Sequence, residues 1–172
     1  MKTTLTVRKL SIDEADKVYA LMCRVTKLPS SQYYSPSDID YYKSRIEDYG
    51  AIFGAFCNNE LVAYAVLDFP GIGSDNFGTL TGAGIPQNEL LRVALMAGCI
   101  VEPGYRGQGI QIELCKEREK YAKSLGCLHL YSTIHPLNNY SLQNVLESGF
   151  KIIFENVKLD WGVRNILYKR IF

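Results

Sequence analysis

The feature that most constrains this chain is an apolar run that ends in a glycine-rich turn. Residues 90–101 are almost continuously apolar, as expected for a central strand that is buried on both faces. The turn after this run reads Glu102-Pro103-Gly104-Tyr105-Arg106-Gly107-Gln108-Gly109. Residues 109–125 then carry apolar positions at helical spacing, and Gly126 suits a C-terminal cap. A buried strand that turns through glycines into an amphipathic helix predicts an α/β fold.

The glycine-rich turn has the chemistry of a phosphate cradle. A turn at a helix N-terminus presents free backbone N–H groups and the positive end of the helix dipole. Glycines allow close approach and positive φ, and Arg106 adds a planar cation. The pattern alone is weak, because the same glycines also suit a tight connection. It is neither a Walker loop, since no Lys-Ser or Lys-Thr follows Gly109, nor a Rossmann turn, since Gln111 and Ile112 replace the glycine needed there.

The remaining segments complete the order β-αα-β-β-β-α-β-α-β-β, which predicts a mixed sheet. The strands expected before the turn are 5–10, 51–57 and 61–67, and two helices follow the first of them, one after the capping box 11–14 and one after 35–38. The elements expected after the turn are a strand at 128–134, a helix at 141–148 and strands at 150–159 and 166–172. Residues 69–88 hold five glycines and two prolines, which predicts a long, mobile loop.

Length and composition exclude several classes of protein. A chain of 172 residues suits one domain, 1–172, that needs neither a disulfide nor a structural metal to fold. A net charge of +1 gives no field for nucleic acid or an anionic membrane. The five cysteines lack metal-ligand spacing, so we expect buried thiols, no metal site and a reducing cytoplasm. The segment 1–5 lacks a signal peptide, and no window is long enough to span a membrane.

Residues 99–150 resemble the acetyl-CoA site of the GNAT superfamily of N-acetyltransferases. The family signature is Arg or Gln, two residues, Gly, one residue, then Gly or Ala, and it falls on Arg106, Gly109 and Gln111, of which only the last departs. Downstream, the stretch from His135 to Ser141, followed by Gly149-Phe150, resembles the family's second half. The resemblance covers the chain well from about residue 51 onward, and the first fifty residues by element order only.

This resemblance implies a GNAT-like mixed, mostly antiparallel sheet flanked by helices, with acetyl-CoA as cosubstrate. The strand before the turn would splay from its neighbour and bind pantetheine through its backbone, the turn would hold the pyrophosphate, and Asn138 would touch the pantetheine arm. Gln111 would crowd the pyrophosphate or donate to it, and we favour donation. The implied cosubstrate-binding residues are Cys99, Ile100, Val101, Arg106, Gly107, Gln108, Gly109, Ile110, Gln111, Ile112, Asn138 and Ser141.

The catalytic base is less readable from the sequence. Acetyl transfer to an amine requires a neutral nucleophile and donors for the oxyanion. The positions of the base and acid in peptide-acetylating branches hold Thr133 and Val145, and the mid-strand glutamate of histone-type branches would fall on an apolar residue. The remaining candidates are Glu89, Glu102 and His135 as bases, with Tyr131 and Tyr140 as acids. We select Glu89, because strand polarity places it towards the acceptor.

We therefore expect an N-acetyltransferase that moves acetyl to a primary amine of a small molecule or peptide by direct attack in a ternary complex. The acceptor would lie between the first helices and the loop 69–88, near the tyrosines 33, 34, 41 and 42. A homodimer is left open. The alternatives are a non-catalytic CoA-binding sensor or regulatory module and an interaction domain that keeps only the fold. Acetyl-CoA binding and thiol release on adding amines distinguish the three.

Overall fold

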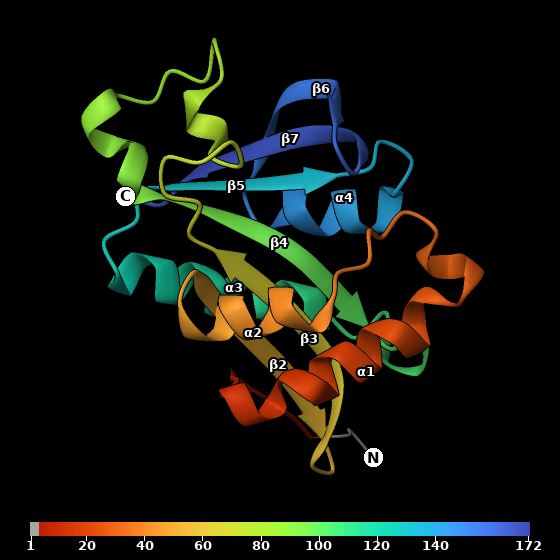
Figure 1. Cartoon of the computed structure of the whole chain (residues 1–172). Helices are drawn as coiled ribbons and strands as arrows, with labels where there is room; N and C mark the ends of the chain where they lie inside the picture. Colours follow the sequence, from red (N-terminus) through yellow and green to blue (C-terminus); the bar gives the residue numbers. More distant parts are fainter. Residues whose placement is uncertain (1–3) are drawn as a thin grey trace.

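The computed structural model describes residues 4–172, and its strands form one seven-stranded sheet (Figure 1). The sheet order is β1-β2-β3-β4-β5-β7-β6, and every neighbouring pair is antiparallel except β4 and β5. The strands are β1 (Leu5–Lys9), β2 (Gly50–Cys57), β3 (Glu60–Asp68), β4 (Val93–Val101), β5 (His129–Ile134), β6 (Lys151–Leu159) and β7 (Gly162–Arg170). The helices are α1 (Ala15–Thr26), α2 (Ile39–Glu47), α3 (Ile110–Ser124) and α4 (Asn139–Glu147). The predicted element order and the mixed, mostly antiparallel sheet are confirmed.

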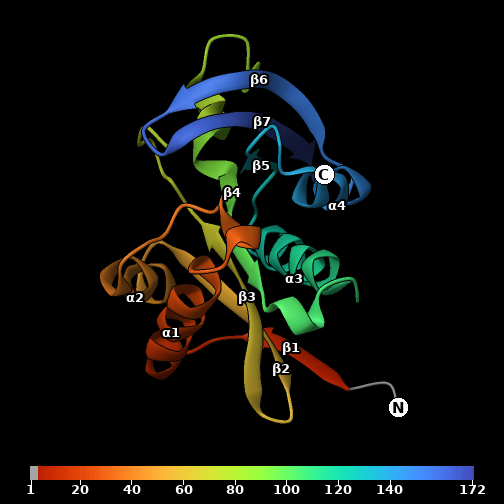
Figure 2. The same cartoon turned by 90° about the vertical axis from the view of Figure 1, so that its right-hand side faces the viewer.

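Helices cover both faces of the sheet, as Figure 2 shows: α1 and α2 lie on one side, and α3 and α4 on the other. On the α1–α2 face, Val18 and Leu21 of α1 pack against Ile52 and other buried residues of β2 and β3. On the α3–α4 face, Leu114 of α3 packs against small side chains of the same two strands, such as Ala63. The helical spacing of apolar residues therefore selects the buried face of each helix.

Strand β4 ends at Val101 as predicted, but it differs from the prediction in where it starts and in how far its second half is buried. It begins at Val93, because residues 87–92 form a 3-10 helix in which the side chain of Leu91 is 73% exposed. Pairing with β5 runs only from Val93 to Met96. On the other edge, Met96 pairs with Leu67 and Cys99 with Ala65, so β4 carries one extra residue there, a β-bulge. Beyond Met96 the strand separates from β5 (Figure 1), and four of its last five residues are half-buried, Ile100 being the exception.

A buried arginine holds the bulge in place. Arg118 of α3 is 3% exposed, and its Nη1 donates to the carbonyl oxygens of Val66 (3.0 Å) and Ala97 (3.3 Å). Its Nε donates to the carbonyl of Leu114 at 3.3 Å. Backbone carbonyls that a bulge leaves out of the ladder need other donors when they are buried. Arg118 therefore stabilises the opening between β4 and β5.

The loop 69–88 is anchored, in contrast to the mobile loop predicted from its glycines. The fully buried side chain of Asn76 donates from Nδ2 to the carbonyls of Gly71 (2.7 Å) and Leu90 (2.8 Å), and its Oδ1 accepts from the Gly78 amide at 3.0 Å. The adjacent Phe77 is buried in a cluster that includes residues of β4 and β5. One polar side chain thus satisfies three backbone groups, which fixes the loop over the sheet.

The remaining predictions from the sequence concern the cysteines, membrane-spanning helices and the N-terminal segment. All five cysteines are free in the structure; three are buried, whereas Cys23 and Cys99 are half-buried. Within residues 4–172, no helix combines the length and the apolar character needed to cross a membrane. Residues 1–3, which open the segment where we expect no signal peptide, lie outside the described residues.

Candidate active site

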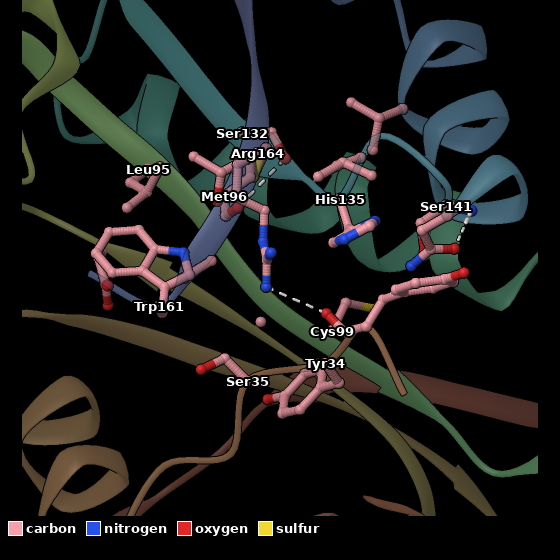
Figure 3. Close-up of a pocket in the computed structure, with 18 of the residues that line it drawn as sticks. Tyr34, Ser35, Leu95, Met96, Cys99, Ser132, His135, Ser141, Trp161 and Arg164 are labelled. Carbon is pink, nitrogen blue, oxygen red and sulfur yellow. Dashed lines mark hydrogen bonds between the residues drawn. The ribbon is translucent and has the colours of Figure 1, made fainter. Parts of the chain in front are cut away.

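A cavity of about 450 Å³ lies where β4 separates from β5 (Figure 3). Its walls come from both faces of the sheet, so the cavity connects the two sides through the opening between the strands. One wall, which we call the α3–α4 half, is formed by α3, by α4 and by the residue before α4. Its lining residues are Gln111, Arg118, Asn138, Ser141 and Val145. Those of the opposite side, which we call the α1–α2 half, include Tyr33, Tyr34, Tyr41, Arg45, Asp68, Asp75, Trp161 and Arg164.

The glycine-rich turn has the conformation expected of an anion cradle. Gly107 and Gly109 have φ of +76° and +77°, in the left-handed region that favours glycine. A Cβ built on either residue meets no protein atom within 4 Å, so the space in front of the turn is open. Helix α3 begins after Gly109 with no side chain capping its amides. The first-turn N–H groups of α3 are therefore free to bind an anion.

The side chain of Arg106 holds this turn through two contacts. Its Nε donates to the carbonyl of Val101 at 3.0 Å, and its Nη2 lies 3.4 Å from Ser31 Oγ. Gly107 is held as well, because its amide donates to the hydroxyl of Tyr140 at 3.1 Å. These contacts fix the turn relative to β4 and to the start of α4. They also occupy one of the backbone groups, the Val101 carbonyl, that the resemblance assigns to pantetheine.

The other residues predicted to bind the cosubstrate differ in how far their side chains are exposed. Cys99 lines the cavity, whereas Ile100 and Ile110 are buried at 3% and 4% exposure, so only their backbone groups are able to serve a ligand. Gln108 is exposed at the tip of the turn, and Ile112 is half-buried in the first turn of α3. The prediction for these positions thus concerns the backbone amides more than the side chains.

Asn138, Ser141 and Gln111 all line the α3–α4 half of the cavity. Asn138 Oδ1 accepts from the Ser141 amide at 3.3 Å and caps α4. Gln111 Oε1 accepts from Asn144 Nδ2 at 2.9 Å, which ties α3 to α4. Both amide side chains use their oxygens within the protein, so their NH₂ groups remain as donors on the cavity wall.

Glu89 does not reach the cavity. It lies in the 3-10 helix before β4 and is not among the lining residues. Its carboxylate lies 2.7 Å from Nε2 of the buried His129 and 3.7 Å from Nη1 of Arg170. The hydrogen bond to His129 holds the pKa of Glu89 below its usual range. A carboxylate with a lowered pKa is a weaker base, so position and chemistry both argue against Glu89 as the catalytic base.

The other candidates from the sequence are bound to other groups or lie outside the cavity lining. Glu102 forms an ion pair with Arg24 at 3.0 Å and does not line the cavity. His135 does line it, but its Nδ1 accepts from the Leu137 amide at 3.1 Å. A neutral imidazole has one acceptor nitrogen, so in this geometry His135 offers a donor and not a base. The buried hydroxyl of Tyr131 has no hydrogen-bond partner among the described residues, and burial raises its pKa to about 12.

The structure adds charged residues that sequence reasoning missed. Asp68 ends β3, and its carboxylate accepts from Arg45 Nε at 2.9 Å and from the Tyr41 hydroxyl at 3.2 Å. Burial raises the pKa of Asp68 above its usual value. Asp75 lines the same half of the cavity from the anchored loop. An acidic residue at the end of the apolar strand 61–67 was a usable signal for Asp68, whereas nothing in the sequence marks Asp75.

The predicted tyrosine cluster separates into wall and core. Tyr33, Tyr34 and Tyr41 line the cavity, whereas Tyr42 is fully buried. The hydroxyl of Tyr64 lies 2.9 Å from that of Tyr34 and 2.7 Å from that of Tyr42. Burial raises the pKa of Tyr34 well above its usual value. These hydroxyls therefore remain protonated well above neutral pH and serve as donors.

Comparison with known proteins finds similarity to acetyltransferases. The model of the acetyltransferase (GNAT) family matches residues 16–150. No curated protein sequence matches the chain. Three similar solved structures are an N-acetyltransferase from Staphylococcus aureus Mu50 (17% identity, TM-score 0.70, 99% of this chain and 100% of that one), the PaiA N-acetyltransferase from Thermoplasma acidophilum in complex with coenzyme A (21%, 0.68, 98% and 99%), and YncA from Salmonella typhimurium with its cofactor acetyl-CoA (14%, 0.71, 99% and 95%). At these identities the structures show a common fold.

Proposed function

Because this chain belongs to the acetyltransferase (GNAT) family, whose cosubstrate is acetyl-CoA, we propose that it transfers acetyl to a primary amine of a small molecule or peptide by direct attack in a ternary complex. The observation that carries the proposal is the cavity that opens on both faces of the sheet. Such a passage lets a thioester enter from the α3–α4 half and an amine from the α1–α2 half, which brings the reactants together. We further propose that the protein acts in the cytoplasm as a single domain, 1–172.

The α3–α4 half suits a cosubstrate with a pyrophosphate and a long polar arm. We assign the pyrophosphate to the amides from Gln108 to Ile112, because they are uncapped and lie at the positive end of the α3 dipole, whereas the Gly107 amide already donates to the Tyr140 hydroxyl. The NH₂ groups of Asn138 and Gln111, with Ser141, would hold the arm. The edge of β4 that lies beyond its pairing with β5 would supply a backbone N–H near Val101 for the oxyanion.

The cysteine on the cavity wall supports direct attack over a covalent intermediate. Cys99 lines the cavity near the separation of β4 from β5, where a nucleophilic thiol could accept an acetyl group. Burial raises the pKa of Cys99 to about 11. A thiol with that pKa is almost entirely protonated at neutral pH, and the protonated form is a poor nucleophile. The amine itself is therefore the attacking group in our proposal.

For the base we replace Glu89 with Asp75. Deprotonation of an ammonium acceptor requires a carboxylate that reaches the cavity, directly or through a water. Asp68 and Asp75 are the carboxylates on its wall, and Asp68 is already held by Arg45 and Tyr41. Asp75 has no ion-pair partner within 4 Å among residues 4–172. Its carboxylate is therefore free to receive the proton of the amine.

The test is a screen for amine-dependent release of CoA thiol from acetyl-CoA, with polyamines, amino acids, aminoglycosides and peptides as acceptors. We expect at least one class to raise thiol release above the background without amine. If no amine releases thiol but acetyl-CoA still gives a clear thermal shift, the sensor alternative is favoured. Thr133 and Val145, which occupy the base and acid positions of the peptide-acetylating branches, are consistent with that alternative. Silence without a shift would favour the interaction domain.

A further inference from the structure

We propose that Arg164 binds a carboxylate of the acceptor, so that the substrate is an amine that also carries a carboxylate, an amino acid or an acidic residue at the start of a peptide. This inference rests on the proposed function, since it names the acceptor class of that same cavity. It starts from a cation that the fold buries without a counterion.

Arg164 projects from β7 into the middle of the cavity, between Trp161 and His135 (Figure 3). It is 7% exposed. Its Nη1 donates to the Val163 carbonyl at 2.8 Å and its Nη2 to the Tyr33 carbonyl at 3.2 Å. Within residues 4–172 no carboxylate lies within 4 Å of its guanidinium. Burial also lowers the pKa of Arg164, as expected when no anion compensates the desolvation.

Other arginines of the chain show what this one lacks. Arg45, on the same half of the cavity, has the carboxylate of Asp68 as its partner. Arg118, which is also buried, donates to three carbonyls, two of them at the bulge, and so has a structural role. A guanidinium has five N–H donors in a planar fork, and Arg164 commits two of them to carbonyls. The remaining donors suit the bidentate geometry of a carboxylate.

The position of Arg164 assigns the anion to the acceptor and not to the cosubstrate. Ile166, two residues along β7 and thus on the same face, packs with Phe77 of the anchored loop, on the face away from α3. The cradle that we assign to the pyrophosphate is at the N-terminus of α3. The two anion sites therefore lie on opposite sides of the sheet.

The surroundings favour a zwitterion over a phosphate. Asp68 and Asp75 line the same half as Arg164, and they would repel a dianion but attract an ammonium group. A cavity of about 450 Å³ that also holds the end of the cosubstrate leaves room for a small acceptor. An ammonium near Asp75 and a carboxylate on Arg164 satisfy both charges of one amino-acid unit.

The first arm of the test compares matched acceptors in the thiol-release assay. Each amino acid is paired with its carboxamide and with its decarboxylated amine, and peptides that begin with Asp or Glu are paired with peptides that begin with Asn or Gln. We expect kcat/KM to be about 10- to 100-fold higher for the carboxylate member, as for a hydrogen-bonded charge. Preference among free amino acids points to the α-carboxylate, and preference among peptides to an acidic side chain.

The second arm changes Arg164. Arg164→Gln should remove the preference for the carboxylate member, and Arg164→Lys should retain part of it because the charge remains but the planar fork is lost. Arg92→Gln is the matched control, because Arg92 is exposed and donates to the Gly126 carbonyl away from the cavity. Thermal unfolding of each variant checks that it is folded. Equal kcat/KM for acid and carboxamide, or a folded Arg164→Gln that keeps the preference, would overturn the inference.

A binding readout separates this inference from the proposed function. Trp161 is the sole tryptophan of the chain, and it lines the cavity, so its fluorescence reports on that half. In the presence of CoA, N-acetyl amino acids should give a saturable change, the corresponding N-acetyl carboxamides should give none, and Arg164→Gln should lose the response. If no amine is acetylated, the proposed function fails, and this titration alone decides the inference: a carboxylate-specific response supports it, and no response overturns it.

Discussion

The two halves of the cavity are built from different parts of the chain. The α3–α4 half, taken together with the adjacent glycine-rich turn, consists of backbone amides and of side chains from α3, α4 and the residue before α4, all within residues 102–145. The α1–α2 half is assembled from side chains of five separate segments, at 33–37, 41–45, 68, 75 and 161–164. The first half is thus a local structure, whereas the second exists only when the whole sheet is folded. This difference predicts that the two halves respond separately to mutation.

The largest expected effect is at Gly109, in the glycine-rich turn next to the α3–α4 half. A ligand that binds only the native state adds RT ln(1 + [L]/Kd), about 2.7 kcal/mol at about a hundredfold excess over Kd. For a chain of this length that corresponds to a rise in Tm of about 5–10 °C. Gly109→Val should abolish the shift on adding acetyl-CoA, because a β-branched residue is strained at φ +77° and its side chain projects into the open space of the cradle.

Gly104→Val is the matched control for that experiment. Gly104 belongs to the same turn, has no positive φ, and also has open space around a Cβ. It should therefore keep the full shift, and Arg106→Ala should only reduce it, since the backbone amides remain. A wild-type protein without any shift at millimolar acetyl-CoA, or a folded Gly109→Val with an undiminished one, would show that the cradle is assigned wrongly.

The next effect concerns the α1–α2 half alone. Asp75→Asn should lower kcat by about 100-fold, the lower range for loss of a general base, and leave the acetyl-CoA shift unchanged. Glu89→Gln should cost stability, because it weakens the contact with His129, but it should keep turnover. Steady-state kinetics and thermal unfolding measure both. The reverse outcome, with Glu89→Gln inactive and Asp75→Asn active, would restore the base that the sequence suggested.

The same contrast explains what the sequence could predict. The sheet, the order of elements and the turn at 102–109 follow from local patterns: apolar runs, capping residues and glycines whose spacing determines backbone geometry. The opening at Met96 depends on a bulge and on Arg118, whose two partners at the bulge are more than twenty residues away in sequence. No local sequence pattern marks Arg164 or Asp75, because their proposed roles depend on the cavity that both residues line. Glu89 lies outside the cavity lining, because strand polarity predicts a direction but not a distance.

The pH dependence of the rate tests which groups act in the acceptor half. Between pH 6 and 9 the rate should rise about tenfold per unit while the neutral fraction of the amine limits it, with no falling limb at pH 8 to 9. A falling limb would require an acid that loses its proton there. Burial raises the pKa of Tyr34 well above its usual value and that of Tyr131 to about 12, so both hydroxyls keep their protons in this range. A bell-shaped profile with its upper limb near 8.5 would reveal an acid that we have not identified.

The smallest effect concerns Gln111, the one departure from the family signature. Its oxygen accepts from Asn144, so only its NH₂ group faces a ligand. If that group donates to the pyrophosphate, Gln111→Ala loses about 1 kcal/mol of ligand binding, and the acetyl-CoA shift shrinks by about 2–4 °C. If the side chain crowds the ligand instead, the shift grows. Asn144→Ala provides the control, because it removes the bond between α3 and α4 but leaves the NH₂ of Gln111 in place. A double-mutant cycle on the free energy of unfolding should give a coupling of about 0.5–1.5 kcal/mol between Gln111 and Asn144. The change in the acetyl-CoA shift, measured against Asn144→Ala, then decides between donation and crowding: a smaller shift indicates donation, and a larger one indicates crowding.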